Sequence, residues 1–358
     1  MHSLPGKTLL LRLSSIGDIV LSSPLIRNLR KTFPEMQLDF LVKSEFADLV
    51  RYNPYLSRII EVDTSAGLRK LTSVGRSIRG ERYDVLVDLH GSLRSIYLRF
   101  LSGARKILKV EKRRVQRWML VRFKRNLYGS VVSVADRYLE PLKPYGISGD
   151  GEGLELYVPD QVVRKVWVQL SEHGLPQGHR VIGFCPSAKH ATKMWPRDSY
   201  IDLGRLLVDR HDARILIFGG EEDRTYCSEI ADSIEHPPRT ESGSSHAEPR
   251  RAFNFAGHFS LLESAAAMDN CSVIVTNDTG LMHIAAARKR PVVAIFGSTV
   301  EEFGFFPYGT RNIVLQNSGL YCRPCTHIGR SKCPEGHFRC MKEVSVGGVA
   351  RAVESLLT

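Results

Sequence analysis

Short apolar runs alternate with segments of helical spacing along most of the chain. In the first half, strands are predicted at residues 7–13, 38–42, 59–62 and 83–90, and helices at 19–33 and 69–79. In the second half, strands are predicted at residues 180–185, 213–219, 253–257, 272–276 and 291–296, with helices at 197–210, 261–268 and after residue 280. Strands that alternate with helices are typical of doubly wound parallel sheets, so the sequence predicts an α/β fold.

A stretch with little helical pattern separates the two series. Residues 141–160 are rich in proline and glycine, although the spacing at 154–158 is compatible with a short strand. A chain of 358 residues is also too long for one typical domain. We therefore predict one domain over residues 1–160 and a second over residues 161–358.

The clearest strand–turn–helix pattern lies in the second half, at residues 272–287. The polar turn Asn277-Asp278-Thr279-Gly280 ends an apolar run, and helical spacing follows it. Asp278 or Thr279 can cap that helix, and Gly280 allows close approach to the backbone. A helix N-terminus after a parallel strand is a ready anion site, although an ordinary capped helix would show the same pattern.

Polar groups follow four predicted strands of the second half, which favours a nucleotide site. They lie at Ser187 to Lys193, at Glu221 to Asp223, at Asp278 to His283, and at residues 297–299. Lys193 could neutralise a pyrophosphate, and the acids Glu222 and Asp223 could bind ribose hydroxyls. The sequence has no GxxxxGK[ST], GxGxxG or HExxH motif, so neither a P-loop ATPase nor a catalytic metal is indicated.

The first half places a different set of polar residues at strand ends. Ser15, Gly17 and Asp18 follow the first predicted strand, and His90 follows the fourth, which makes them candidates for binding an acceptor. Asp18 could cap the helix predicted to start at Ile19. It could equally take a proton from an acceptor hydroxyl.

The net charge of +12 indicates an anionic partner. Residues 105–125 hold ten basic residues and one acid, with Trp118, Leu120 and Phe123 among them. Such a segment suits an anionic membrane surface or an acidic substrate, for which Arg113, Arg114 and Arg117 are candidate ligands. A solvated helical face is the alternative. A nucleic-acid-binding protein also fits the charge, but no RNP, helix-turn-helix or zinc-finger pattern supports it.

The cysteines favour a reducing compartment. There are seven, and we find no signal peptide or membrane-spanning segment, so we predict a cytoplasmic protein. Four of them, Cys322, Cys325, Cys333 and Cys340, lie close together in the sequence. The CxxC half fits a structural zinc site, whereas the second half lacks the usual spacing, so reduced thiols are the alternative.

Three motifs resemble glycosyltransferase family 9, the ADP-heptose:lipopolysaccharide heptosyltransferases. They are Leu10-Leu-Arg-Leu-Ser-Ser-Ile-Gly-Asp-Ile-Val-Leu-Ser-Ser-Pro24, Lys193-Met-Trp-Pro196, and Asn277-Asp-Thr-Gly-Leu-Met-His283 followed by residues 291–297. They occur in the family's order and span nearly the whole chain. The resemblance implies a GT-B fold, in which two Rossmann-like domains face each other across a cleft. The acceptor would bind the N-terminal domain and the sugar nucleotide the C-terminal domain.

The resemblance also implies roles for individual residues. Asp18 matches the proposed catalytic base, and Lys193 matches the lysine at the donor phosphates. Asp278, Thr279, Gly280 and His283 match the donor-binding turn, whereas Glu222 and Asp223 align ambiguously with the ribose contact. The four-cysteine segment is not part of the family's minimal pattern.

These observations predict an inverting transferase that moves heptose from ADP-heptose to the lipopolysaccharide inner core. Its partners would be ADP-heptose, a lipid A-core acceptor and the inner face of the cytoplasmic membrane, with no nucleic acid and no required cofactor. A transferase of the same fold with another nucleotide sugar is the nearest alternative. A catalytically silent sugar-nucleotide-binding protein is a second, against which intact Asp18 and Lys193 speak.

Overall fold

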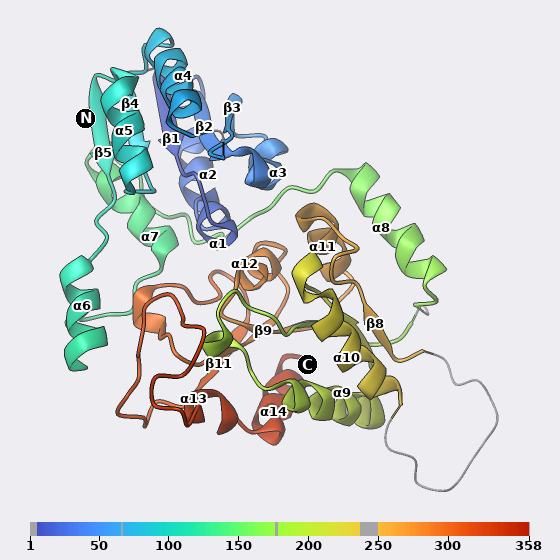
Figure 1. Cartoon of the computed structure of the whole chain (residues 1–358). Helices are drawn as coiled ribbons and strands as arrows, with labels where there is room; N and C mark the ends of the chain where they lie inside the picture. The colour runs from blue at the N-terminus through green and yellow to red at the C-terminus, as the bar shows by residue number, and fades with distance from the viewer. Residues whose placement is uncertain (1–5, 66, 176–177, 237–249, 358) are drawn as a thin grey trace, which may run out of the picture. The chain divides into compact units, whose positions relative to one another are not determined.

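The computed structural model describes residues 6–65, 67–175, 178–236 and 250–357. The chain forms two compact units, each built on a parallel sheet (Figure 1). The first unit contains Met1–Arg114 and Val132–Tyr157, and the second contains Val115–Val131 and Val158–Thr358. The segment Val115–Val131 therefore packs with the second unit, although the sequence on both sides of it belongs to the first.

In its described residues, the first unit has a five-stranded parallel sheet of order β3-β2-β1-β4-β5. The strands are β1 (Lys7–Leu11), β2 (Gln37–Lys43), β3 (Arg58–Val62), β4 (Val85–Asp88) and β5 (Lys106–Lys109). The helices are α1 (Ile16–Val20), α2 (Ser23–Thr32), α3 (Asp48–Arg51), α4 (Gly67–Gly80), α5 (Leu93–Ser102) and α7 (Val134–Leu139). The central strand β1 is apolar and buried because helices cover both faces of such a sheet.

The second unit has a sheet of order β11-β10-β9-β6-β7-β8 in the residues described. The strands are β6 (Val181–Cys185), β7 (Arg214–Ile217), β8 (Ala252–Asn254), β9 (Val273–Asn277), β10 (Val292–Phe296) and β11 (Asn312–Gln316). The helices are α6 (Arg114–Phe123), α8 (Asp160–Glu172), α9 (Arg197–His211), α10 (Arg224–Glu235), α11 (Leu261–Met268), α12 (Gly280–Ala287), α13 (Arg339–Lys342) and α14 (Val346–Leu357). The predicted doubly wound α/β fold is thus confirmed in both units.

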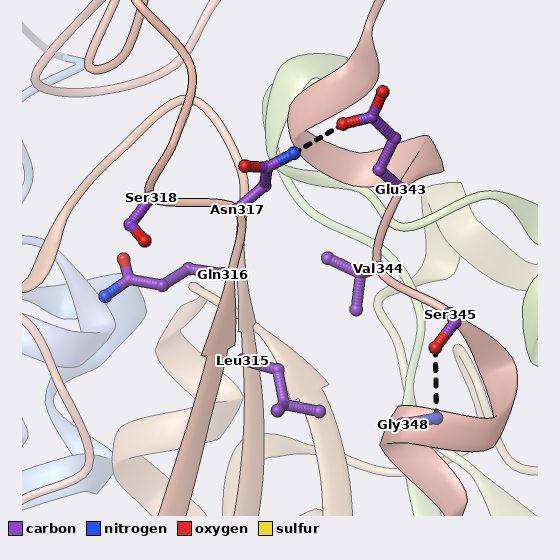
Figure 2. Close-up of a pocket in the computed structure, with 8 residues that line it drawn as sticks. All are labelled: Leu315, Gln316, Asn317, Ser318, Glu343, Val344, Ser345 and Gly348. Atoms are coloured by element: carbon purple, nitrogen blue, oxygen red, sulfur yellow. Dashed lines mark hydrogen bonds between the residues drawn. The ribbon is translucent and has the colours of Figure 1, made fainter.

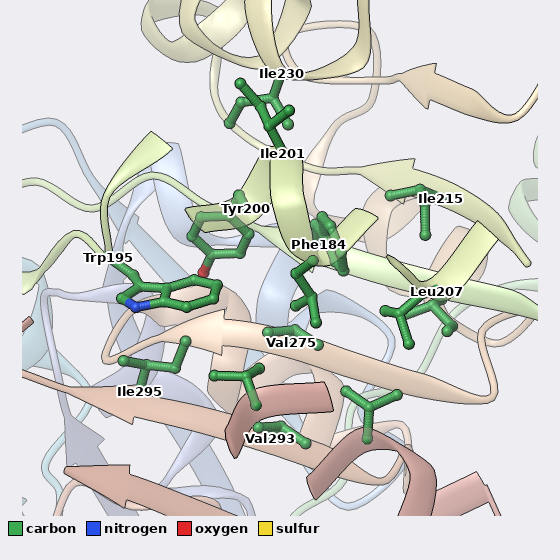
Figure 3. Packing of buried hydrophobic residues seen from close by; sticks show 14 of the residues in the cluster. Phe184, Trp195, Tyr200, Ile201, Leu207, Ile215, Ile230, Val275, Val293 and Ile295 are labelled. Carbon is green, nitrogen blue, oxygen red and sulfur yellow. The ribbon is translucent and has the colours of Figure 1, made fainter. Parts of the chain in front are cut away.

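The core of the second unit holds the loop that carries Lys193. Trp195, two residues further on, is fully buried, and its ring lies 5.1 Å from that of Tyr200 (Figure 3). Phe184 of β6 packs against the other side of Tyr200, at 5.4 Å between ring centroids. Aromatic rings bury large apolar areas, so Trp195 anchors the loop to the sheet.

The prediction of a single helix at residues 19–33 is wrong, because the structure has two helices there, α1 and α2. Ser15, not Asp18, is the N-cap of α1, and Asp18 lies in its first turn as the partner of Ser15 in a capping box. Pro24 lies at the start of α2, where its missing N–H costs no helical hydrogen bond. The helix therefore begins one turn earlier than predicted, and Asp18 takes part in its cap from within the first turn.

The strand considered at residues 154–158 does not form. The segment is irregular, although Leu154 and Leu156 are buried. Buried and less buried residues alternate here, which imitates a strand pattern in a segment that forms none. The short, basic edge strand β5 and the strand β11 were not predicted.

Candidate functional site

Asp18 lies beyond the carboxyl end of β1, in a group of polar side chains from the first unit. Its Oδ1 is 2.5 Å from Nη2 of Arg12 and accepts a 3.3 Å hydrogen bond from the hydroxyl of Tyr138. Its Oδ2 accepts hydrogen bonds from the Ser15 hydroxyl at 2.8 Å and the Ser15 N–H at 3.3 Å. The Asp18 side chain is 16% exposed, so the carboxylate is held firmly but remains reachable.

These contacts fix the charge of Asp18. Burial alone would raise the pKa of the carboxyl, but the charge of Arg12 and the hydrogen bonds from Ser15 outweigh it and lower the pKa. Burial and the adjacent carboxylate raise the pKa of Tyr138, so its hydroxyl stays protonated. Asp18 is therefore an ionised acceptor at neutral pH, and Arg12 and Tyr138 orient it.

Sequence reasoning missed Arg12 and Tyr138. Arg12 interrupts an apolar run, which is a usable signal for a charged group at a strand end. Tyr138 lies on α7, far from Asp18 in the sequence, and no local pattern marks it.

His90 lies on the turn after β4, which pairs with β1. Asp88 shapes this turn, because its Oδ1 accepts hydrogen bonds from the N–H groups of His90 at 2.9 Å and Gly91 at 2.8 Å. Nδ1 of His90 is buried and has no hydrogen-bond partner in the described structure. Burial and the nearby charge of Arg12 lower the pKa of His90 to about 4, so the imidazole is neutral at physiological pH.

The three candidate acceptor arginines do not share one environment. Arg113 pairs with Glu140 at 2.7 Å within the first unit. Arg114 is exposed where α6 begins, and Arg117 lies on α6, which packs with the second unit. Lys124, just after α6, donates a 2.7 Å hydrogen bond to the Pro324 carbonyl of the cysteine-rich segment.

Lys193, Asp278 and Thr299 meet beyond the carboxyl ends of β9 and β10. The Lys193 ammonium lies 2.6 Å from Oδ2 of Asp278, which also accepts a 2.7 Å hydrogen bond from the Thr299 hydroxyl. The Lys193 side chain is 15% exposed. Two of the sequence-predicted donor residues thus lie together, and Thr299, from the polar strand end at residues 297–299, joins them.

The turn between β9 and α12 has the predicted form. Thr279 is the N-cap of α12, and its hydroxyl makes no capping hydrogen bond and is buried without a partner among the described residues. Gly280 opens the helix, whereas His283 is buried with its ring 6.4 Å from that of Phe305. The N–H groups and the Thr299 and Thr279 hydroxyls are donors of the kind that bind phosphate oxygens.

The two candidate ribose ligands, Glu222 and Asp223, lie on the acidic loop after β7 but differ in their surroundings. Oδ2 of Asp223 accepts hydrogen bonds from the Ser187 hydroxyl at 2.7 Å and the Gly220 N–H at 2.9 Å. Asp223 therefore joins the loops after β6 and β7. Glu222 is exposed, so its carboxylate is accessible to a ligand.

Asn277 joins two further loops and was not predicted as a site residue. Its side chain accepts a 3.0 Å hydrogen bond from the Trp195 N–H and donates one of 2.7 Å to the Pro186 carbonyl. Because Asn277 is fully buried, this amide fixes the Lys193 loop relative to β9.

Cys322, Cys325, Cys333 and Cys340 are free thiols in this structure. Cys322 Sγ lies 3.8 Å from Nε2 of His337, and burial raises the pKa of Cys340 to about 11. Within the described parts of the chain, no three His, Cys, Asp or Glu side chains are arranged to hold a metal ion. A structural zinc at Cys322, Cys325, Cys333 and Cys340 stays a prediction, to be tested by metal analysis of protein purified without chelators.

A pocket of about 340 Å³ lies elsewhere, beyond the carboxyl end of β11 and beside the start of α14 (Figure 2). Gln316, Asn317, Glu343 and Ser345 are among its lining residues, and Asn317 donates a hydrogen bond to Glu343. None of the sequence-predicted site residues lines it, so we assign it no part in donor binding.

Comparisons with known proteins identify the family of this chain. The model of glycosyltransferase family 9 (heptosyltransferase) matches residues 71–335. Lipooligosaccharide heptosyltransferase 2 of Haemophilus influenzae is 28% identical, over 81% of this chain and 83% of the relative. Lipopolysaccharide heptosyltransferase 2 of Escherichia coli K12 is 27% identical, over 83% and 84%.

Solved structures agree on the fold. A glycosyltransferase family 9 protein from Veillonella parvula has a TM-score of 0.81 at 22% identity, covering 100% of this chain and 98% of the other. The E. coli ADP-heptose LPS heptosyltransferase II has a TM-score of 0.72 at 22% identity, covering 98% of each. The two-unit α/β architecture is therefore that of these transferases. Since the family model spans well over half of the sequence, this chain belongs to glycosyltransferase family 9, the heptosyltransferases, and is a glycosyltransferase.

Proposed function

We propose that this enzyme transfers heptose, with inversion, from ADP-heptose to the inner core of lipopolysaccharide. Relatives at 24–28% identity are named lipopolysaccharide or lipooligosaccharide heptosyltransferases. The observation that carries the proposal is the group of Lys193, Asp278 and Thr299 beside the N-terminus of α12. It combines a cation with hydroxyl and N–H donors, which is what a departing nucleoside diphosphate requires.

The second unit would stabilise the leaving group. Negative charge grows on the diphosphate as the glycosidic bond breaks, and Lys193 and the first N–H groups of α12 can bind it. Asp278 holds the Lys193 ammonium in place before the donor arrives. A preorganised contact of this kind is worth on the order of 10² to 10³ in rate. We propose that these groups replace a metal ion, and that Glu222 binds the ribose.

The first unit would activate the acceptor. Its hydroxyl attacks the anomeric carbon, positive charge develops on the sugar ring, and the proton passes to Asp18. The lowered pKa makes Asp18 a weak base toward a free alcohol. Proton transfer therefore occurs late, when bond formation has already made the hydroxyl acidic. Arg12 and Tyr138 keep the carboxylate aimed, and neutral His90 can hydrogen-bond an acceptor hydroxyl.

We also propose that the enzyme works at an anionic membrane surface. None of the helices in the described residues combines the length and apolarity needed to cross a membrane. α5 begins three residues after His90 and exposes an apolar stripe of Leu93, Ile96 and Phe100, with Leu93 85% and Phe100 81% exposed. Exposed basic residues lie nearby in the sequence and fold, namely Arg94 on α5, Lys106 and Lys109 on β5, and Lys112, which donates to the Gly91 carbonyl. Apolar and basic groups together suit a surface of acidic lipids.

A donor panel tests the proposed substrate. Purified protein is titrated calorimetrically with ADP, UDP, GDP and CDP, and transfer is then assayed with the corresponding sugar nucleotides. We expect ADP to bind most tightly and ADP-heptose to support transfer. Preference for another nucleotide sugar would mean that the proposed donor is wrong, although the family assignment would stand. Binding without transfer would favour a catalytically silent sugar-nucleotide-binding protein.

A further inference from the structure

The cysteine-rich segment after β11 contacts the donor loops through Arg323, which lies between Cys322 and Cys325. The Arg323 guanidinium donates to the main-chain carbonyls of Gly297 at 2.5 Å, Thr299 at 2.7 Å and Asn317 at 3.0 Å. It also donates to the side-chain carbonyl of Gln316 at 2.6 Å. One side chain thus connects the ends of β10 and β11.

The same segment makes a second contact with the Lys193 loop, through the main chain of Arg330. The Thr192 N–H donates to the Arg330 carbonyl at 3.1 Å, and the Arg330 N–H donates to the Thr192 hydroxyl at 2.8 Å. Thr192 in turn donates to the Ser298 hydroxyl at 3.0 Å. The residue preceding Lys193 is therefore tied both to the cysteine-rich segment and to the loop that Arg323 holds.

These loops are closely packed against each other. A Cβ added at Gly297 would lie 2.9 Å from the Thr192 carbonyl oxygen and 2.8 Å from the Met341 side chain. Thr299, whose carbonyl Arg323 binds, also donates its hydroxyl to Asp278, the partner of Lys193. Two contacts thus connect the Arg323 guanidinium to the Asp278–Lys193 pair.

We propose that Arg323 is a positioning residue for the donor diphosphate, and that the cysteine-rich segment is part of the donor site's supporting structure. Arg323 holds the carbonyls of Gly297 and Thr299, and so fixes the Thr299 hydroxyl on Asp278 before the donor binds. This role rests on the proposed donor function of Lys193 and α12. Without Arg323 the loop must be ordered when the diphosphate binds, which lowers affinity because the entropy is lost at that step.

The test compares single variants of the full chain and one double variant. Arg323→Gln removes the guanidinium, Arg323→Lys keeps the charge and one set of donors, and Arg290→Gln is the matched control. Arg290 also donates to main-chain carbonyls, those of Arg288 and Asp269, but it precedes the amino end of β10, opposite the donor loops. ADP affinity is measured by calorimetry, melting temperature by calorimetric scan, and transfer by steady-state kinetics.

We expect Arg323→Gln to weaken ADP binding about tenfold, the scale of one lost charged hydrogen bond. The donor KM should rise by a similar factor and the acceptor KM should stay unchanged. Arg323→Lys should recover part of the loss, and Arg290→Gln should bind ADP like wild type. Combining Arg323→Gln with Thr299→Val should cost less than the sum of the two single losses, because both act on Asp278.

Unchanged ADP affinity in folded Arg323→Gln overturns the inference, even if its melting temperature falls, because Arg323 then only stabilises the fold. An equal loss of affinity in Arg290→Gln overturns it too, since the effect would not be local. If Arg323→Gln does not fold, the ADP affinity of Arg323→Lys is compared with that of wild type instead, and an unchanged affinity again overturns the inference. Failure of the wild-type protein to bind any nucleoside diphosphate would instead refute the proposed donor function.

Discussion

Asp18 is the residue whose removal separates chemistry from donor binding. We expect Asp18→Asn to lower kcat by at least about 10², because general-base catalysis typically contributes 10² to 10⁴. ADP affinity should stay within a few-fold, since the proposed phosphate site belongs to the second unit. Asp84→Asn is the control: Asp84 pairs with Arg105 and precedes β4, away from the carboxyl ends of the strands. Near-normal turnover of Asp18→Asn would leave Asp18 only its place in the capping box.

Lys193 should supply the charge that a metal ion supplies in other transferases. We expect Lys193→Ala to weaken ADP binding and to slow transfer by on the order of 10². The control is Lys189→Ala, which removes an exposed lysine from the same loop. In wild type, EDTA should leave the rate unchanged. Loss of activity in EDTA and its return with Mg²⁺ would show that a metal takes part.

His90 makes stability depend on pH through its buried ring. Its folded-state pKa of about 4 lies below the usual value of 6.5, so the folded protein binds fewer protons than the unfolded chain between these limits. The stability due to neutral His90 is full above pH 6.5 and is lost as the pH falls toward 4. Allowing for partial exposure, we expect a loss on the order of 1–2 kcal/mol.

Urea unfolding of wild type and His90→Gln between pH 7.5 and 4 measures this effect. The variant should show a shallower decline in the free energy of unfolding. Parallel curves for the two proteins would mean that His90 titrates normally in the folded state.

At the residue scale, the sequence predicted chemistry that depends on local pattern and missed chemistry that depends on the fold. Asp18 and Lys193 could be selected because each lies on a polar turn after an apolar run. Tyr138 could not be selected, because it reaches Asp18 only when distant segments pack together. Thr299 belongs to a polar strand end that the sequence indicated, but its hydrogen bond to Asp278 is a long-range contact that no local pattern predicts.

At the scale of elements, buried strands were the most predictable. β2, β6 and β10 were placed within one residue at each end, because continuous apolar runs are the signature of strands covered on both faces. The edge strand β5 was missed, since two lysines surround only two apolar residues and three of its four residues are exposed. α6 was recognised as basic and partly apolar, but its packing with the second unit is a long-range property.

At the scale of the whole molecule, the net charge of +12 is spread over both units, and the basic segment at residues 105–125 is divided between them. A triple variant of Arg113, Arg114 and Arg117 would therefore change both units at once, and its effects could not be assigned to either. Arg117 lies on α6, which Lys124 ties to the cysteine-rich segment, so its replacement need not leave donor binding untouched. Arg113 and Arg114 should be replaced separately from Arg117.

The membrane surface is tested by comparing three sets of substitutions in liposome sedimentation. The first replaces Leu93, Ile96 and Phe100 of α5 with Ser, and the second replaces Arg113 and Arg114 with Gln. The control replaces Val163, Trp167 and Val168 with Ser, which removes a comparable exposed apolar face from α8 of the second unit. Each is measured on anionic and on neutral vesicles, at low and high salt.

We expect wild type to bind anionic vesicles most tightly at low salt, because each basic residue near the surface contributes about 1 kcal/mol. The arginine variant should lose part of this salt-dependent binding and show a raised acceptor KM. At 1 M salt, where the Debye length is about 3 Å, the remaining binding should come from apolar contacts. The α5 variant should lose that remainder, while the α8 control keeps it. If the α5 variant sediments like wild type at every salt concentration and the control does not, the membrane-facing surface belongs to α8, and the stripe beside His90 is only solvated.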